Sequence, residues 1–290
     1  MTTDLFSQHD WHTVLQGPLS KMRARPTEAG VDYWLQAGDQ SVALSPLLGK
    51  PVRLQHTGKI FCQHCGTETR KSFQGFCYEH FMSLAQADSC IMSPEKCHFE
   101  QGTCREPEWG ERHCFQTHFV YLANTGQVKV GITRGTQIPV RWLDQGAEEA
   151  LPVARVRSRY LAGLLEVLLA QHVSDKTNWR QMLKGKAESI DLAACRDNLF
   201  AKCRQELQDL QNQYGVQAIQ LIQQAEVYTV TYPVLTFPTT LKSCTFDKTT
   251  QVEGVLQGIK GQYLILDTGV INIRRHTGYE VIIEQTEAPH

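Results

Sequence analysis

The sequence has no long hydrophobic run and no large excess of one charge. Its most apolar stretch, LAGLLEVLLA, is interrupted by Glu166 and falls short of the roughly 18 apolar residues that a membrane-spanning helix needs. With 29 basic and 30 acidic side chains in 290 residues, the formal net charge is -1. This balance excludes binding of nucleic acid through the overall field, so any such partner must meet a local basic surface. We expect no membrane partner.

We also expect no secretory leader. The N-terminal residues MTTDLFSQHDWH contain neither a basic segment nor an apolar run of the kind that directs export. The chain contains no internal repeat and no low-complexity tract. We therefore predict a cytoplasmic globular protein, long enough for one large domain or for two to three small ones.

Cysteine, in contrast, is abundant and clustered, because seven of the ten cysteines lie between residues 62 and 114. Thiols stay reduced in the cytoplasm and thiolates bind zinc strongly, so the cluster indicates metal binding rather than a disulfide scaffold. Cys62 and Cys65 form a C-x2-C knuckle, and the pair Cys77 and His80 begins twelve residues after Cys65. These two pairs predict a closed tetrahedral zinc site, with unligated core cysteines as the alternative.

The second half of the cluster predicts another zinc site. Its simplest ligand set is four cysteines, namely Cys90, Cys97, Cys104 and Cys114. His98 or His118 is an alternative to one of these ligands, an iron–sulfur cluster is an alternative to zinc, and buried free thiols are the simplest alternative of all. Neither proposed site leaves an open coordination position, so both metal ions are expected to be structural.

Hydrophobic periodicity predicts an α+β protein in five segments. In chain order we expect an N-terminal β segment (1–59), a zinc-binding module (60–116), a ββαβα core (117–185), a helical segment (186–225) and a small β-barrel or sheet (226–290). The N-terminal strands are expected to complete that barrel or sheet. One long amphipathic helix is predicted over 187–214.

Within the core segment the predicted elements alternate closely. Strands are expected over 119–123, 128–132 and 152–157, with a short helix from about Pro139 and a longer helix over 159–173. Leucines recur at helical spacing along that last helix, and Glu166 interrupts them. Its small neighbours Ala162, Gly163 and Ala170 would leave room for a ligand over the carboxylate, whereas the alternative is a solvated glutamate on the polar side of the helix.

The run FVYLANTGQVKVGIT, residues 119–133, resembles the paired strands of the GIY-YIG nuclease superfamily. The closest similarity is to the branch in which the second motif reads K-[IV]-G-I-T, and it extends through Arg141 and Glu166 to Asn178. The resemblance implies a cleft lined by Tyr121, Lys129, Arg141 and Glu166. It also implies that Glu166 holds Mg²⁺ or Mn²⁺ against a phosphate oxygen, that Tyr121 or Lys129 orients or deprotonates water, and that Arg141 offsets developing charge.

Lys129 departs from the superfamily pattern, which has a tyrosine at this position. A lysine with an ordinary pKa of about 10 is a poor base unless it is desolvated, so a phosphate clamp is the alternative role for Lys129. Over the whole chain, the sequence is similar to a widespread bacterial family of uncharacterised proteins. That similarity rests on the strings CIMSPEKCHFEQGTCREPEWGERHC, KVGITR, RWLDQGA, KTNW and KGQYLILDTGVINIRRHTG, and it implies no activity.

The core segment is locally basic, since residues 117–185 contain nine lysines and arginines against five acidic side chains. Such an excess suits a phosphate backbone, and a solvated face with salt bridges is the alternative. Arg155, Arg157 and Arg159 alternate and would project from one face if strand geometry persists. Together with Arg134 they are the candidate nucleic-acid-binding residues. Trp109, Trp142 and Trp179 are candidates for base stacking or, alternatively, for core packing.

These features support one leading hypothesis of function and two alternatives. The leading hypothesis is a nucleic-acid phosphodiesterase, an endonuclease that uses Mg²⁺ or Mn²⁺ on DNA or RNA, with structural Zn²⁺. The first alternative is a non-catalytic zinc-containing DNA- or RNA-binding protein, in which the nuclease-like core serves as a docking surface. The second is a protein-interaction scaffold, with the long, Gln-rich helix predicted over 187–214 as one contact surface.

Overall fold

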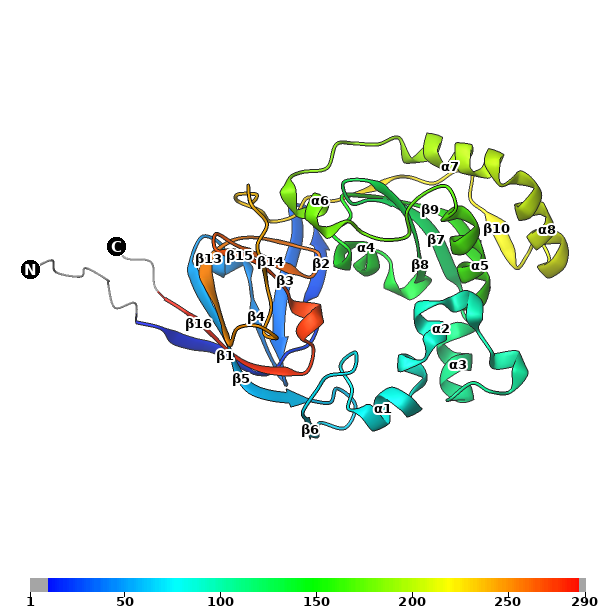
Figure 1. Ribbon diagram of the computed structural model, residues 1–290. Coiled ribbons are helices and arrows are strands. Elements are labelled where there is room, and N and C mark those ends of the chain that lie inside the picture. Colours follow the sequence, from blue (N-terminus) through cyan, green and yellow to red (C-terminus); the bar gives the residue numbers. More distant parts are fainter. Residues whose placement is uncertain (1–9, 287–290) are drawn as a thin grey trace, which may run out of the picture. The chain divides into compact units, whose positions relative to one another are not determined.

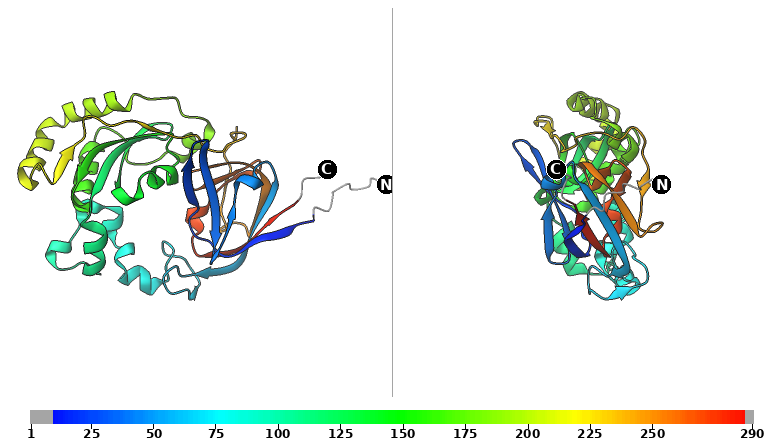
Figure 2. Two further views of the ribbon diagram at one scale, coloured as in Figure 1. Left: turned by 180° about the vertical axis from the view of Figure 1, so that it is seen from behind. Right: turned by 90° about the vertical axis from the view of Figure 1, so that its left-hand side faces the viewer.

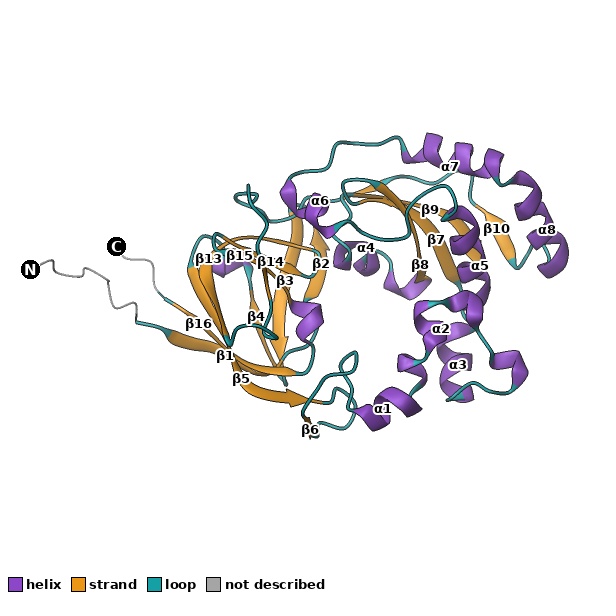
Figure 3. Ribbon diagram, viewed as in Figure 1, coloured by secondary structure: helices purple, strands orange, loops and turns teal. Residues whose placement is uncertain are grey.

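The computed structural model describes residues 10–286 as a mixed α+β protein, as predicted (Figure 1). Residues 1–9, on which the expectation of no secretory leader partly rests, lie outside the described residues. The chain divides into two compact units. Of the described residues, unit 1 comprises 10–25, 32–77 and 233–286, and unit 2 comprises Pro26–Val31 and Tyr78–Tyr232. All α-helices of the described residues fall in unit 2, and the short helices of unit 1 that share their colour in Figure 3 are the 3-10 helices Ser45–Leu47 and Ile273–His276.

The main sheet of unit 1 joins strands from both ends of the chain. Its strand order is β1-β16-β5-β13-β14-β15-β12, and β6 pairs with β5. The strands are β1 (His12–Pro18), β5 (Pro51–Phe61), β6 (Glu68–Thr69), β12 (Ser243–Cys244), β13 (Gln251–Lys260), β14 (Tyr263–Leu266), β15 (Gly269–Asn272) and β16 (Tyr279–Gln285).

This sheet decides between the two alternatives expected for unit 1, a barrel or a sheet. The N-terminal strands do pair with the C-terminal strands, but they form an open sheet rather than a closed barrel. Strand β12 at one edge has two residues and is too short to continue the ladder toward β1 at the other edge. A second sheet has the order β2-β3-β4 and contains β2 (Arg23–Thr27), β3 (Gly30–Ala37) and β4 (Gln40–Ala43).

The sheet of unit 2 carries the predicted core strands. Its order is β10-β9-β7-β8, all pairs are antiparallel, and β11 also pairs with β9. The strands are β7 (His118–Asn124), β8 (Val128–Arg134), β9 (Glu149–Val156), β10 (Ile219–Leu221) and β11 (Tyr228–Thr229). The three strands predicted over 119–157 are thereby confirmed, whereas the resemblance to the nuclease superfamily stays a prediction.

Two hydrophobic clusters form around this sheet because alternate residues of each strand face opposite sides. Val120 and Leu122 of β7 pack in one cluster with the apolar face of α5 (Arg159–Leu169). Tyr121 of the same strand packs in the other cluster with Trp142 of α4 (Val140–Asp144). Ser158 caps α5 by accepting a 3.3 Å hydrogen bond from the Leu161 N–H.

The helix expected over 187–214 is wrong in its length and continuity. It consists of α7 (Leu192–Lys202) and α8 (Arg204–Tyr214), which meet at Cys203. Cys203 leaves helical geometry, with φ -100 and ψ 20, and both helices keep their buried leucines against the unit 2 core. Helix α7 contacts β7 and β9, and α8 contacts β10 (Figure 2).

The remaining helices are short. They are α1 (Tyr78–Ser83), α2 (Ser89–Met92), α3 (Pro107–Cys114) and α6 (Trp179–Lys184), with the 3-10 turn η3 at Pro94–Lys96. Among the described residues, no helix is both long enough and apolar enough to cross a membrane.

Candidate functional site

The first predicted metal site is assembled by residues close together in the chain. The four ligand atoms of Cys62, Cys65, Cys77 and His80 all lie within 4.8 Å of one another. Cys62 and Cys65 flank the turn that follows β5, and His80 lies in α1 (Figure 1). Three thiols and an imidazole at this spacing form a donor set that can hold a metal ion such as zinc.

Backbone amides around Cys62 favour its thiolate form. Burial raises the pKa of Cys62, but hydrogen bonds from the backbone of Cys65, Cys77 and His64 outweigh burial and lower the pKa to about 7. A hydrogen bond with the Thr67 hydroxyl lowers the pKa of Cys65 as well, and the Cys65 sulfur lies 3.3 Å from that hydroxyl oxygen. Since zinc binds the deprotonated thiol, this knuckle fits a cation.

The four cysteines predicted for the second site line one cavity. Cys90, Cys97, Cys104 and Cys114 surround a space of about 20 Å³, together with apolar side chains. Burial raises the pKa of Cys90 to about 12, and Asp88 and the other three thiols act in the same direction. The ligand atoms that lie within 4.8 Å of one another here are those of Asp88, Cys90 and His98 rather than the four sulfurs.

His98 and His118, the two alternative histidine ligands for the second metal site, differ in their hydrogen-bond partners. The Nδ1 atom of His98 lies 2.8 Å from the Thr103 hydroxyl and its Nε2 lies 3.3 Å from Asp88, so both ring nitrogens are engaged. His118 is 0% exposed and its Nδ1–H donates to the Gln116 carbonyl at 2.8 Å. Its Nε2 is buried without a partner among the described residues. A bound backbone carbonyl on one nitrogen and a free lone pair on the other are typical of a metal-ligating histidine.

The four residues singled out by the nuclease resemblance come together in unit 2. Glu166 of α5 is half-buried, and it interacts electrostatically with Lys129, Arg141, Arg159 and Asp175. Burial raises the pKa of Glu166 to about 7, although the three cations act in the opposite direction. This environment differs from that of a glutamate on the solvated side of a helix. We call Tyr121, Lys129, Arg141 and Glu166 the acid–cation cluster.

Lys129 is the least ordinary cation in the acid–cation cluster. It is 4% exposed, and the chain at Ser174 runs beside it because the Val130 N–H donates to the Ser174 carbonyl at 2.8 Å. Burial lowers the pKa of Lys129 to about 8, and Arg141 lowers it further while Glu166 and Asp175 raise it. A neutral amine is therefore accessible near physiological pH.

Burial shifts the pKa of Tyr121 in the opposite direction from that of Lys129. It is 0% exposed, its hydroxyl donates to Gln145 Oε1 at 2.9 Å, and Arg141 forms a hydrogen bond to the same hydroxyl. Burial raises the pKa of Tyr121. The hydroxyl is therefore a poor base in this position and serves to hold Arg141. The sequence patterns did not single out Gln145, although it lies within the string RWLDQGA.

At two positions near the acid–cation cluster, only glycine avoids a steric clash with neighbouring atoms. Gly131 faces Tyr121 across the β7–β8 pair, and a Cβ at residue 131 would lie 2.7 Å from the Tyr121 hydroxyl oxygen. At Gly163 a Cβ would lie 2.7 Å from both the Glu95 N and the Pro94 Cβ of η3. The expectation that small residues beside Glu166 leave room for a ligand is therefore wrong at Gly163, because η3 fills that space.

The predicted nucleic-acid-binding arginines divide into two groups. Arg155 and Arg157 are exposed and line the same cavity, as expected for alternating strand residues. Arg159 does not share their face, because α5 begins there; its Nη2 donates to the Ile91 carbonyl at 2.6 Å. Arg159 and Arg134 lie near Cys114 and His118 and affect the pKa of both.

The tryptophans and Asn178 have structural partners. Trp142 is 4% exposed in the core cluster of Tyr121, and Trp109 stacks on His113 at 4.2 Å. The Arg180 guanidinium lies 4.5 Å from the centre of the Trp179 ring. Asn178 caps α6 by accepting a 3.3 Å hydrogen bond from the Gln181 N–H.

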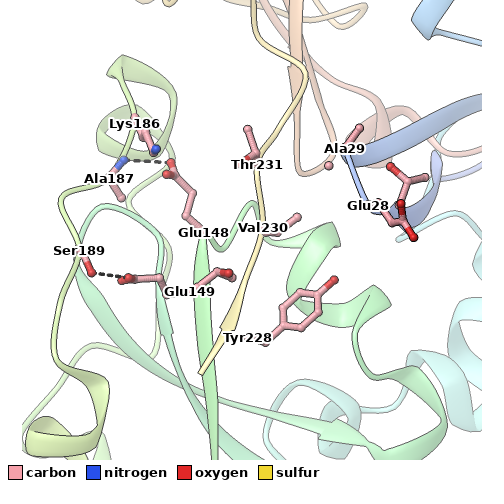
Figure 4. A pocket seen from close by; sticks show the side chains of 13 residues that line it. Glu28, Ala29, Glu148, Glu149, Lys186, Ala187, Ser189, Tyr228, Val230 and Thr231 are labelled. Atoms are coloured by element: carbon pink, nitrogen blue, oxygen red, sulfur yellow. Dashed lines mark hydrogen bonds between the residues drawn. The ribbon is translucent and has the colours of Figure 1, made fainter. Parts of the chain in front are cut away.

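Unit 2 also contains an acidic cavity that the sequence patterns did not indicate. It measures about 450 Å³, and Glu148, Glu149, Lys186, Ser189 and Tyr228 are among its lining residues (Figure 4). Glu148 accepts a 2.9 Å hydrogen bond from the Ala187 N–H, and Glu149 accepts a 2.5 Å hydrogen bond from the Ser189 hydroxyl. The two carboxylates thus hold the segment before α7 in place, and we assign them a structural role.

The fold and these sites define an α+β protein with a Cys/His cluster that can hold a metal ion. By sequence, residues 49–281 match the family described as Protein of unknown function (DUF2797), and the chain belongs to that family. No curated protein and no solved structure matches the chain.

Proposed function

We propose that this protein is a metal-dependent nucleic-acid phosphodiesterase, similar to the GIY-YIG nucleases, whose reaction centre is the acid–cation cluster. The observation that carries the proposal is the convergence of four residues that are distant in sequence. Tyr121, Lys129, Arg141 and Glu166 come from β7, β8, α4 and α5. Arg141 and Glu166 lie close enough to affect the pKa of Tyr121 and of Lys129, and Lys129 and Arg141 affect the pKa of Glu166. A carboxylate facing two cations in a partly dry site suits phosphoryl chemistry.

Glu166 is the candidate ligand for the divalent cation. A bound Mg²⁺ or Mn²⁺ would polarise a phosphate oxygen and offset the negative charge that grows in the transition state. Arg141 would bind the same phosphate group, and its hydrogen bond to Tyr121 would fix its direction. Arg159 adds a second positive charge near the carboxylate.

Lys129 is the candidate base in this scheme. Its low exposure and lowered pKa of about 8 make the neutral amine available to accept a proton from water. A desolvated lysine would thus take the part that the superfamily pattern gives to its second tyrosine. The charged form would instead clamp the phosphate, and the pH dependence of cleavage separates the two roles.

Zinc has a structural part in the proposal. We assign one Zn²⁺ to Cys62, Cys65, Cys77 and His80, and a second to Cys90, Cys97, Cys104 and Cys114, with His118 as the alternative ligand. The second site would support the reaction centre, because η3 packs on Gly163 of α5 and Arg159 is bound to the Ile91 carbonyl. Thiolate ligands of this kind suit the cytoplasm, where we propose that the protein acts.

A cleavage assay tests the proposal. Zinc-loaded protein is incubated with labelled single-stranded, duplex and hairpin DNA and RNA, with Mg²⁺, with Mn²⁺ or without either. We expect metal-dependent cleavage of at least one substrate and a loss of about 100-fold or more in Glu166→Gln. Glu188→Gln is the matched control, since that exposed glutamate lies outside the acid–cation cluster. Cleavage that Glu166→Gln leaves unchanged would remove the assigned mechanism.

The burial of Tyr121 favours a second candidate function, a nucleic-acid-binding protein without catalysis. A tyrosine that is 0% exposed and bonded to Gln145 does not reach a substrate in this conformation. In that case the protein would bind nucleic acid with an affinity that falls steeply with salt, and no divalent cation would produce cleavage.

A further inference from the structure

A groove in unit 2 combines aromatic side chains with an exposed arginine. Its volume is about 540 Å³, and its lining includes Phe99, Phe115, Tyr160, Tyr214 and Arg157. These residues come from the Cys-rich segment, from the end of β9, from the start of α5 and from the end of α8. A volume of this size matches the range of small-ligand pockets and accommodates an unpaired nucleotide.

The aromatic rings in the groove are arranged in two edge-on pairs. Phe99 and Phe115 have ring centres 4.6 Å apart at 61°, and Tyr160 and Tyr214 have ring centres 6.2 Å apart at 78°. Neither pair is stacked face to face, and an edge-on contact covers only one ring face of a pair, so the other faces are not covered by contact within the pair. Phe115 is 46% exposed, which is unusual for a phenylalanine in a folded protein.

Positive charge adjoins these rings. A second cavity of about 200 Å³ shares Arg157 with the groove, and apart from Val156 its other lining residues are polar and include Arg155 and Gln220. Arg155 donates to Gln220 Oε1 at 3.3 Å, which directs its guanidinium along this surface. Glu100 is the single acidic residue among the described residues that line the two cavities, so arginine dominates the local charge.

We propose that this groove binds single-stranded nucleic acid, with bases on the aromatic rings and phosphates on Arg155 and Arg157. The inference rests on the proposed function only in the identity of its ligand as a nucleic acid. Stacking on aromatic rings beside a cationic track is how proteins hold unpaired bases without reading their sequence. Bases in a duplex are already stacked on each other, so the groove selects single strands and unpaired ends.

The groove lies next to the acid–cation cluster along the chain. Arg157 lines the groove, whereas Arg159 interacts with Glu166, and only Ser158, the N-cap of α5, lies between these two arginines in the sequence. We expect a strand bound in the groove to extend past Arg157 toward Arg159 and the proposed reaction centre. The substrate class implied is a single strand or a duplex with a single-stranded extension.

Fluorescence anisotropy with labelled 20-nucleotide DNA and RNA tests the groove, in buffer without Mg²⁺ or Mn²⁺ so that no cleavage occurs. We expect single strands to bind at least tenfold more tightly than the matched duplex. Phe115→Leu, which keeps an apolar side chain but removes the π face, is expected to weaken binding about fivefold or more, and Phe115→Trp to preserve it. Arg157→Gln is expected to weaken binding and to lower the slope of log K against log salt by about 0.7.

Arg180→Gln is the matched control, because Arg180 is exposed in unit 2 outside both cavities and its loss is expected to leave binding unchanged. The proposal would be overturned if duplex and single strand bound equally tightly. It would also be overturned if the Phe115, Arg157 and Arg180 variants lost equal amounts of affinity. Tight binding of a peptide library with no binding of oligonucleotides would also overturn it.

Failure of the groove and failure of the proposed function give different results. If binding depends on the groove residues but no divalent cation produces cleavage, the proposal of a nucleic-acid-binding groove stands and the proposed phosphodiesterase is rejected. If cleavage depends on Glu166 but is unchanged in Phe115→Leu and Arg157→Gln, the proposed phosphodiesterase stands and the proposed groove is rejected.

Discussion

Lys129 and Glu166 show how burial gives two ordinary charged residues unusual acidity. Both side chains lose much of their hydration, so the pKa of the lysine falls to about 8 and that of the glutamate rises to about 7. The sequence indicated Lys129 only through a resemblance, whereas Glu166 also stood out because it interrupts the leucines of its helix. Their desolvation was not predictable from the sequence, because the segment around Ser174 and the arginines that surround them are brought there by the fold.

The raised pKa of Glu166 has a consequence for stability. The pKa of Glu166 is 4.5 in its ordinary state and about 7 in the folded protein. Between these two pH values the folded protein binds more protons at Glu166 than the unfolded chain does, so the free energy of unfolding falls as pH rises. Glu166→Gln removes this dependence. In zinc-loaded protein without Mg²⁺, we expect the Tm of the variant to increase relative to wild type between pH 5 and pH 8. Parallel Tm changes in the two proteins would show that Glu166 ionises as it does in solvent.

Lys129 makes a separate prediction for the rate of cleavage. If the neutral amine accepts a proton from water, kcat/KM increases as pH rises toward about 8, and Lys129→Arg is inactive because arginine stays protonated. If the charged amine clamps the phosphate, Lys129→Arg retains most of the activity and the rate falls above pH 8. A pH–rate profile of both proteins with Mg²⁺ distinguishes the two roles.

Gly131 tests the packing of Tyr121. A methyl group at residue 131 would lie 2.7 Å from the Tyr121 hydroxyl oxygen, so Gly131→Ala is expected to destabilise the protein by about 1–3 kcal/mol. Gly185→Ala is the matched control, because nothing lies within 4 Å of its Cβ position. Chemical denaturation measures both. Equal midpoints for the two variants would contradict the close contact.

At the scale of elements, local patterns predicted the unit 2 core better than the segments around it. The strands β7, β8 and β9 and the helices α4 and α5 occur where apolar periodicity placed them. The helix expected from residue 187 begins at Leu192 instead, because Glu148 and Glu149 accept hydrogen bonds from the backbone N–H groups of Ala187 and Ile190. Side-chain carboxylates from β9 and the loop before it thus override local helix propensity, and no local pattern reveals such contacts.

Glu149 provides the test of this contact between elements. Its carboxylate accepts hydrogen bonds from the Asn124 amide, the Ser189 hydroxyl and the Ile190 N–H, at 2.8, 2.5 and 3.1 Å. Glu149→Ala leaves these donors unpaired and is expected to cost about 1–3 kcal/mol of stability. Glu188→Ala, on the exposed neighbour, is the control. Urea denaturation that shows equal stability for both variants would count against the contact.

The Glu149 contact also predicts a pH window. Hydrogen bonds from Asn124, Ser189 and Ile190 outweigh burial and hold the pKa of Glu149 below its usual value of 4.5. Its contribution is therefore present above pH 4.5 and is lost as pH falls through the lowered pKa. The stability difference between wild type and Glu149→Ala should shrink on acidification into that range.

At the scale of the whole molecule, the two candidate metal sites differ in how far the sequence predicted them. The spacing of Cys62, Cys65, Cys77 and His80 predicted a cluster that the structure brings within 4.8 Å. The second set was less predictable, because spacing places four cysteines near one another without fixing which atoms meet. Its cavity of about 20 Å³ has room for an ion but not for a larger ligand.

Zinc content and its removal test both sites. We expect two Zn²⁺ per chain by elemental analysis, one in Cys65→Ser and one in Cys104→Ser. Cys195→Ser is the control that keeps both, since Cys195 lies outside the clusters. A strong chelator should lower the Tm, because zinc binding contributes directly to folding of such modules. A full zinc content in Cys104→Ser would reject the second site.

The most direct test of the proposed reaction centre is the stoichiometry of Mn²⁺ bound to zinc-loaded protein, measured by electron paramagnetic resonance at pH 8. We predict one Mn²⁺ per chain in wild type and in Glu188→Gln, and loss of that ion in Glu166→Gln with the zinc content unchanged. Equal Mn²⁺ binding in wild type and Glu166→Gln would contradict the assignment of Glu166 as the cation ligand.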